Sequence, residues 1–177
     1  MVKNSVRFFL LGIVFLMIFM FFLPKANLFY FVQRELKESN LLIDFDTINE
    51  NGYTLSMTNT TVYLKDIDVL KADIASLDTY LFYNTVVLEE VKLSSLAKEF
   101  LPLKINEIKV VYTLSNPTKL FFNGDGEIGK VQGNVDLLDK KVFLILFPSS
   151  LMKKRYLKTL RYFHKNKNGE LYYEYKY

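Results

Sequence analysis

The sequence predicts a mainly β protein, in which an N-terminal transmembrane helix precedes a curved antiparallel β-sheet, shaped like a half-barrel or groove, with a few short helices. Three observations lead to this prediction. A long apolar run opens the chain, apolar and polar residues alternate with a period of two after residue 41, and the alternating segments are joined by short connections. Short connections favour antiparallel neighbours, and no βαβ rhythm is present.

The composition indicates a folded chain and excludes several kinds of site. Half of the 177 residues are hydrophobic and 16% are aromatic, which is too apolar for a disordered chain. Cysteine is absent, so disulfides, thiolate zinc sites and a cysteine nucleophile are excluded. Of the 23 basic residues, Lys3, Arg7 and Lys25 flank the apolar run, which leaves 20 against 19 acidic residues. The soluble part is therefore nearly neutral, and no nucleic-acid binding is expected.

Residues 1–25 are interpreted as a cytoplasmic tip and a transmembrane helix. The uncharged run Phe8–Leu23 has 16 residues, and the helix counted from Ser5 has 19, with Arg7 at the edge of the membrane. A helix of that length measures about 28 Å, close to the about 30 Å of a hydrocarbon core. Pro24 disfavours helical geometry at the preceding residue, so the helix should end there. The expected membrane-spanning residues include Phe8, Leu11, Val14, Ile18 and Phe22.

The flanking residues predict how the chain is placed in the membrane. A cleaved signal peptide is the alternative, but the apolar run is long and ends in bulky residues rather than a small-residue cleavage site. The positive-inside rule places Lys3 and Arg7 in the cytoplasm. In a bacterium, the chain would be a single-pass inner-membrane protein with its C-terminal domain in the periplasm.

Residues 26–40 are predicted to form a juxtamembrane amphipathic helix. Leu28, Phe31, Val32 and Leu36 recur at helical spacing and form one apolar face. We expect this face to cap the domain that follows, with the membrane surface as the alternative contact.

Residues 41–177 are predicted to form an antiparallel β domain. A first strand alternates from Leu41 to Thr47, and Asn51-Gly52 is a hairpin signal because both residues tolerate positive φ. Asp139-Lys140 is interpreted as a tight turn. Further strands are expected at 53–58, 61–65, 67–79, 80–92, 106–114, 118–128, 130–137, 141–147 and 171–177.

Two helical segments are predicted to interrupt the strands. The first runs from Ser94 to Phe100, and the second runs from Ser149 to about His164 with a basic outer face. A basic amphipathic helix can contact anionic headgroups, while a solvated outer face is the alternative. The candidate contacts to anionic lipid are Lys154, Lys158 and Arg161.

The strand at 142–147 is apolar on both faces, whereas a half-solvated strand alternates. Both of its faces should therefore be covered, either by ordinary protein packing or by an acyl chain in a hydrophobic groove. The candidate groove residues are Phe45, Leu55, Met57, Val142, Leu144 and Leu146.

No motif in the chain predicts catalysis. Gly124 to Gly129 fits G-x-G-x-x-G literally, but an alternating strand pattern follows it instead of the helix that nucleotide binding requires. His164 is the single histidine and has no acid near it in sequence. We therefore expect no catalytic residue, metal site or cofactor, and a protein that is not an enzyme.

The order of these features resembles the GspN-like and AsmA-like envelope protein families and, more loosely, the periplasmic LptC-type module. The resemblance lies in the anchor and the short helix, in the hairpin segments 52–59, 70–74 and 88–93 that follow them, and in the glycine-rich strands 124–137. It implies an inner-membrane-anchored periplasmic protein whose curved sheet opens on an apolar concave side. AsmA-like proteins are linked to lipid traffic between membranes, and GspN-like proteins accompany type II secretion systems.

The expected function is that of a non-enzymatic envelope component that contacts lipid or other hydrophobic cargo through an apolar sheet face. The alternative is an assembly or scaffold subunit of a secretion-type envelope complex, which docks another protein by edge pairing at the tyrosine-rich C-terminal strand. The expected partners are the membrane, a lipid ligand and other envelope proteins.

Overall fold

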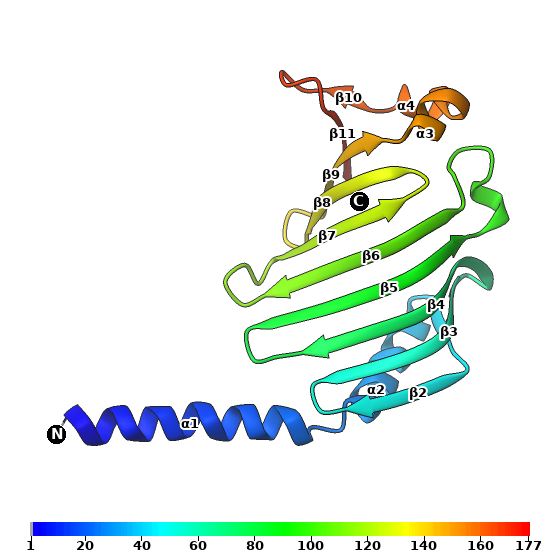
Figure 1. Cartoon of the computed structure of the whole chain (residues 1–177). Helices are drawn as coiled ribbons and strands as arrows, with labels where there is room; N and C mark the ends of the chain where they lie inside the picture. The colour runs from blue at the N-terminus through cyan, green and yellow to red at the C-terminus, as the bar shows by residue number, and fades with distance from the viewer. Residues whose placement is uncertain (1) are drawn as a thin grey trace.

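A computed structural model describes the backbone of residues 2–177 and the side chains from residue 6 onward. Within these residues the chain is mainly β, and its strands form one 11-stranded antiparallel sheet that stays open rather than closing into a barrel (Figure 1). The predicted fold class is confirmed at this level. The helical elements are α1 Val2–Phe22, α2 Lys25–Glu38, the 3-10 helix η1 Ser95–Ala97, α3 Ser150–Arg155 and α4 Leu157–Leu160.

The strands follow the predicted order along the chain. They are β1 Leu41–Asp44, β2 Thr47–Asn51, β3 Thr54–Leu64, β4 Ile67–Thr79, β5 Tyr83–Leu93, β6 Lys104–Thr113, β7 Lys119–Gly126, β8 Gly129–Asp136, β9 Lys141–Pro148, β10 His164–Lys165 and β11 Leu171–Lys176. From β3 to β9 each strand pairs with the next, after which β11 pairs with β9 and β10 with β11.

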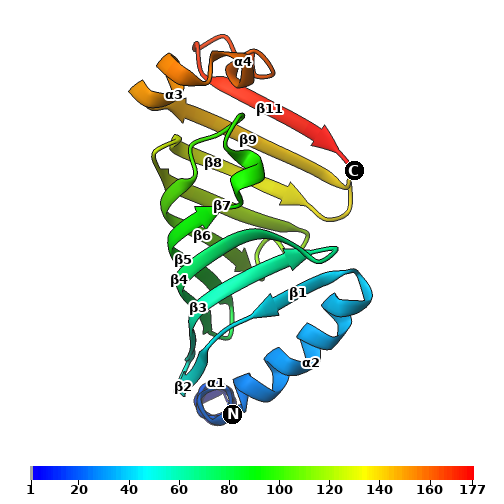
Figure 2. The same ribbon diagram turned by 90° about the vertical axis from the view of Figure 1, so that its right-hand side faces the viewer.

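The sheet curves from one edge to the other. β1 and β2 both pair with β3, so together they form the first edge, and β11 and β10 form the last. Figure 2 shows the sheet bowing away from α2, which lies on its concave side next to the first edge. The turns of the hairpins β2–β3, β4–β5, β6–β7 and β8–β9 lie at one end of the strands, here called the proximal end. The opposite end, which carries η1 and α3, is called the distal end.

α1 extends away from the sheet on the proximal side (Figure 1). The five predicted membrane-spanning residues are all exposed along it. Within the described residues no single helix is long and apolar enough to cross a membrane, whereas Val6–Phe22 and Lys25–Glu38, which are bent by 70°, meet that measure as a pair. The transmembrane span stays a prediction.

Two strand boundaries differ from the predictions. The expected first strand breaks after Asp44, whose Oδ1 accepts a bond from the Phe45 amide at 3.1 Å, so the chain leaves the ladder there. Conversely, the two strands expected at 53–58 and 61–65 are one strand, β3, which passes through Asn59 at a φ of 49°. Glu90 of β5 has a similar φ of 50°. The register of β3 with β4 is the same on both sides of Asn59, and the register shift in this pair lies between Val62 and Tyr63.

α2 packs through a different face from the one predicted. Gln33 Nε2 donates to the carbonyl oxygen of Ile43 on the edge strand β1, and the rings of Phe29 and Phe45 lie 5.8 Å apart. Of the expected packing residues, Leu28, Phe31 and Val32 are exposed and Leu36 is half-buried. The cause is that the helix covers the unpaired main chain of the edge, which needs a hydrogen-bonding side chain as well as apolar contact.

The helix expected from Ser149 to His164 is broken in two. Tyr156 separates α3 from α4 at φ −117° and ψ 35°. Met152 of α3 is fully buried, whereas Thr159 Oγ1 of α4 donates to the carbonyl oxygen of Phe100 at 2.6 Å. A continuous helix could not make both of these tertiary contacts, so the helix breaks between them. The segment expected to be helical at 94–100 is reduced to η1.

Candidate functional site

The sheet has one face that is apolar across almost its whole width. Side chains of directly paired residues lie on the same face, so the register can be followed from strand to strand. One register row runs through Ile48, Met57, Ala75, Leu88, Ile108, Gly124, Val131, Leu146 and Leu171. A second row runs through Leu55, Leu77, Val86, Val110, Phe122, Gly133, Leu144 and Tyr173. These two rows define the apolar face, and from β3 to β11 neither contains a charged residue; in β2 the second row ends on Glu50, which pairs with Leu55.

The other face of the sheet is more polar. The row between the two apolar rows runs through Ser56, Ser76, Val87, Lys109, Asn123, Gln132, Ile145 and Tyr172, so polar residues and one charged residue are mixed with apolar ones. Glu50 pairs with Leu55 and therefore belongs to the apolar side, where the junction between α1 and α2 contacts it. Because α2 lies inside the curve of the sheet (Figure 2), the apolar face is the concave one.

Cover on the apolar face is confined mainly to its two ends. The helices pack mostly against the outer strands, with α2 on β1 and β2 and α3 on β9. Leu55 and Leu146 are accordingly almost fully buried. In the central strands Val86 is 37% exposed, and Ile108 and Val131 are partly exposed. The middle of the apolar face is open in the described structure.

An apolar hollow of about 170 Å³ lies in this open part. It is lined by Ile105, Ile108, Phe122, Asn123, Gly124, Ile128 and Val131. Gly124 leaves the space open because it has no side chain, and a Cβ built there would meet nothing closer than 3.5 Å. Gly133 is different, since a Cβ would lie 2.2 Å from the carbonyl oxygen of Phe143. One glycine thus permits close strand packing, while the other leaves room.

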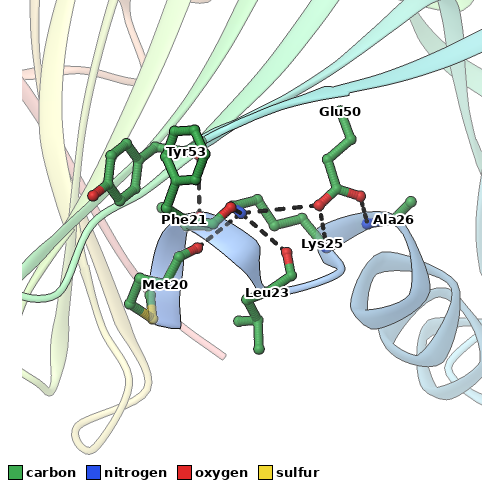
Figure 3. A network of polar contacts seen from close by, with 8 residues as sticks. Met20, Phe21, Leu23, Lys25, Ala26, Glu50 and Tyr53 are labelled. Atoms are coloured by element: carbon green, nitrogen blue, oxygen red, sulfur yellow. Dashed lines mark hydrogen bonds and ion pairs between the residues drawn. The ribbon is translucent and has the colours of Figure 1, made fainter. Parts of the chain in front are cut away.

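The junction between α1 and α2 forms a fixed elbow (Figure 3). The Lys25 ammonium donates to the carbonyl oxygens of Met20 at 2.9 Å and Leu23 at 3.1 Å, which satisfies the C-terminal end of α1. The Glu50 carboxylate accepts from the backbone amides of Lys25 at 2.9 Å and Ala26 at 3.2 Å, which satisfies the N-terminal end of α2. Lys25 is only 2% exposed, so its charge serves this elbow.

Hydrogen bonding sets the acidity of Glu50. The backbone amides of Lys25 and Ala26 stabilise the carboxylate and lower its pKa below 4.5, with a smaller contribution from the Lys25 charge, while partial burial opposes the shift. Glu50 is therefore ionised at neutral pH, and the sheet holds the elbow through a charged group.

The predicted basic residues lie at the distal end. Lys154 and Lys158 are exposed on α3 and α4. Arg161 lines a hollow of about 550 Å³ together with Lys153 and Lys165, over apolar residues that include Leu146 and Leu171. The hollow was not predicted, because its walls come from three separate segments of the chain.

The predicted groove residues divide into three groups. Phe45 lies between β1 and β2 and packs against α2. Leu55, Met57 and Leu146 belong to the apolar face but are buried, whereas Val142 and Leu144 are half-buried. Of the strand expected to be covered on both faces, residues 142–146 are buried or half-buried and Phe147 is exposed.

The open residues of the apolar face, above all Val86, Ile108, Phe122 and Val131, were not singled out from the sequence. Apolar and polar residues alternate in their strands as clearly as in the other strands, and this alternation was the available signal. Alternation alone does not distinguish an open strand from a covered one.

No arrangement for catalysis is found among the described residues. His164 is exposed in β10 and lies against the ring of Tyr172, and the part of the chain that was searched holds no group of three or more potential metal ligands. Gly124 and Gly129 lie in the β7–β8 hairpin, where no helix N-terminus is available for a phosphate.

No family model, curated protein or solved structure matches this chain. Its function is therefore inferred from its own geometry and chemistry.

Proposed function

We propose that this chain is a non-enzymatic, membrane-anchored component of the bacterial envelope that holds the acyl chain of a lipid, or similar hydrophobic cargo, on its apolar sheet face during transport between membranes. The observation that carries the proposal is the pair of register rows that hold no charged residue from β3 to β11 and that stay partly exposed over β5 to β8. The resemblance to AsmA-like and GspN-like proteins agrees with it.

The hydrophobic effect gives the physical reason. A sheet face that permanently meets water normally carries polar side chains, and large contiguous apolar patches on soluble surfaces mark binding sites. Covering apolar surface yields about 25 cal/mol per Å². An acyl chain laid along the open rows would bury apolar surface without leaving any charge unpaired, because neither row contains one over β5 to β8.

The anchor supports the same proposal. α1 stands clear of the sheet and exposes apolar side chains along its length, such as Phe8 and Phe22. In the proposed arrangement α1 lies in the inner membrane with Lys3 and Arg7 in the cytoplasm and the sheet in the periplasm. The elbow then holds the sheet against the bilayer surface.

Site-specific photocrosslinking in membranes tests this function. A photoreactive amino acid at Val131 would face the hollow, whereas the same group at the adjacent Gln132 would face the opposite side of the sheet. Lipid adducts, identified by mass spectrometry, are expected at position 131 and in much lower yield at 132. Equal yields at the two positions, or no adduct at either, would contradict the proposal.

A second function, docking of another envelope protein, is favoured by the free last edge of the sheet. β10 pairs only with Leu171 and Tyr172, so the outer side of 173–176 has no strand beside it in the described structure. The Asn166 amide donates to the Glu170 carbonyl, so even-numbered residues of this strand direct their amides to the free edge. Lys176→Pro would remove one such amide. If another envelope protein crosslinks to the unchanged chain and not to Lys176→Pro, that result would support docking at this edge.

A further inference from the structure

The two ends of the strands differ in chemistry. At the proximal end, three of the hairpin turns contain no charged residue: Asn51–Tyr53, Tyr80–Phe82 and Leu114–Thr118. At the distal end, each connection contains charged residues: Lys65 and Asp66, Lys98 and Glu99, Glu127, and the basic α3. Two of the proximal turns have common turn residues, Asn51-Gly52 and Ser115-Asn116-Pro117, whereas Tyr80–Phe82 is wholly aromatic or apolar. The proximal end is therefore set apart by the lack of charge in three of its turns.

Large apolar side chains project from the proximal turns. Phe82 is 63% exposed and Leu138, at the tip of the β8–β9 hairpin, is 75% exposed, and Leu114 is also exposed. The Asp136 carboxylate accepts from the backbone amides of Leu138 at 3.1 Å and Asp139 at 3.0 Å, which holds this tip in place. These amides and Lys119 lower the pKa of Asp136, so the tip is held by a charged carboxylate at neutral pH.

Main-chain hydrogen bonds join the proximal turns into one continuous rim. They are the bonds Thr79 N to Tyr53 O at 2.9 Å, Leu114 N to Phe82 O at 3.1 Å, Leu137 N to Thr118 O at 2.8 Å and Tyr177 N to Lys140 O at 2.9 Å. The aromatic and large apolar side chains of this rim include Tyr53, Tyr80, Phe82, Leu114, Leu138 and Tyr177, and the fourth turn also exposes Asp139 and Lys140.

The rim is continuous with the anchor. Tyr53 Oη donates to the carbonyl oxygen of Met17 at 3.0 Å, and its ring lies 5.4 Å from the ring of Phe21 and 5.3 Å from that of Tyr80. Met17 precedes the end of α1 by five residues, or about 7.5 Å of helix. If α1 ends at the membrane surface, Tyr53 therefore lies at headgroup depth, where tyrosines gather in membrane proteins.

We propose that the rim is a membrane-contacting surface, whose tips insert into the headgroup region of the bilayer that holds α1. The rows of the apolar face would then open directly onto that bilayer, and lipid would enter the sheet at the rim. This inference rests on the membrane anchor of the proposed function and adds a second contact to it. The occupant is a lipid surface because the tips combine exposed apolar side chains, an aromatic link to the anchor and a lack of charge in three turns.

The experiment exploits the absence of tryptophan from the chain. Single tryptophans are placed at two separate tips, L138W and F82W, and at a matched distal position, L96W, where the native leucine is 67% exposed. Each full-length variant is reconstituted in nanodiscs of phosphatidylethanolamine and phosphatidylglycerol, with or without brominated acyl chains. Bromolipid is expected to quench both tip variants strongly and L96W weakly, and aqueous iodide to show the reverse order.

If iodide quenches both tip variants as efficiently as it quenches L96W, the proposal that the rim contacts the membrane is wrong. It is also wrong if the tips are shielded from iodide but not quenched by bromolipid, which would indicate a protein partner. The lipid adduct at Val131 is measured separately: if it is absent while the tips are quenched, the cargo proposal fails and the rim stands. If the adduct is present while bromolipid does not quench the tips, the rim proposal fails and the cargo proposal stands.

Discussion

Val86 and Val91 are the same residue type in the same strand, yet Val86 is 37% exposed and Val91 is 1% exposed. In β6 Val86 pairs with Val110, and Val91 pairs with Ile105, which lines the hollow together with Ile108. Val91 lies close to where the chain folds back, with the Leu93 amide bonded to the Leu103 carbonyl, whereas Val86 lies in the open middle. Strict alternation would place these two residues on opposite faces, and Glu90 with a φ of 50° lies between them. The same residue type in one strand is thus buried near a connection and exposed in the middle of the sheet.

The largest expected effect comes from truncating covered and open side chains of the sheet to alanine and comparing the losses in stability. Leu55→Ala should lower the free energy of unfolding by about 2–5 kcal/mol, because it empties a fully covered site. Val86→Ala should lower it by less than about 1 kcal/mol, because much of that side chain already meets solvent. Urea titrations in detergent micelles measure both, with Val91→Ala as the matched valine control. Similar losses for Val86 and Val91 would break the comparison.

The two glycines of the apolar face provide the next contrast. Gly133→Ala should destabilise the protein by about 1–3 kcal/mol, since the new Cβ would overlap the Phe143 carbonyl oxygen. Gly124→Ala meets only ordinary contacts and should be close to neutral. The same urea titrations test this pair, and a neutral Gly133→Ala would show that the strands are less tightly packed than described.

The elbow should loosen at low pH. Because the folded-state pKa of Glu50 is lowered below 4.5, the carboxylate contributes stability that is fully present above that value and is lost as the pH falls through the lowered pKa. Spin labels on single cysteines in α1 and α2 should report a broader distance distribution in acid. Glu50→Gln should show that breadth already at neutral pH and little further change, whereas an unaltered distribution in Glu50→Gln would contradict the role of the carboxylate.

The smallest change in stability is expected where the effect on binding is largest. Gly124→Leu should leave the free energy of unfolding nearly unchanged, because its side chain enters the hollow rather than a packed core. It should nevertheless reduce the lipid adduct at Val131 several-fold. The adduct is quantified by mass spectrometry against the unchanged Gly124 chain, and an undiminished yield would place the cargo elsewhere on the face.

Local patterns predicted much of the fold. Alternation located β4 at 67–79 with its observed bounds, and the Asn51-Gly52 signal marks a real hairpin, in which Gly52 adopts a φ of 55°. The juxtamembrane helix was likewise expected where α2 lies. The prediction was wrong for the helix at 149–164, since contacts of Met152 and Thr159 with distant segments decide its break.

The site was predicted less completely than the fold. Leu55 and Leu146 were expected to line a groove and do lie on the apolar face, but both are covered. The elbow was not foreseen either, because Glu50 and Lys25 are 25 residues apart and meet only through the placement of β2.

Alternation, turn residues and apolar runs act over a few neighbouring positions, so the amino-acid order alone dictates a two-faced sheet preceded by an apolar helix. Burial depends on which distant segments pack over a surface. Only the tertiary arrangement therefore decides that the apolar face is covered at Leu55 and Val91, stays open at Val86 and Val131, and ends on the side of α1 in a rim of turns of which three carry no charge.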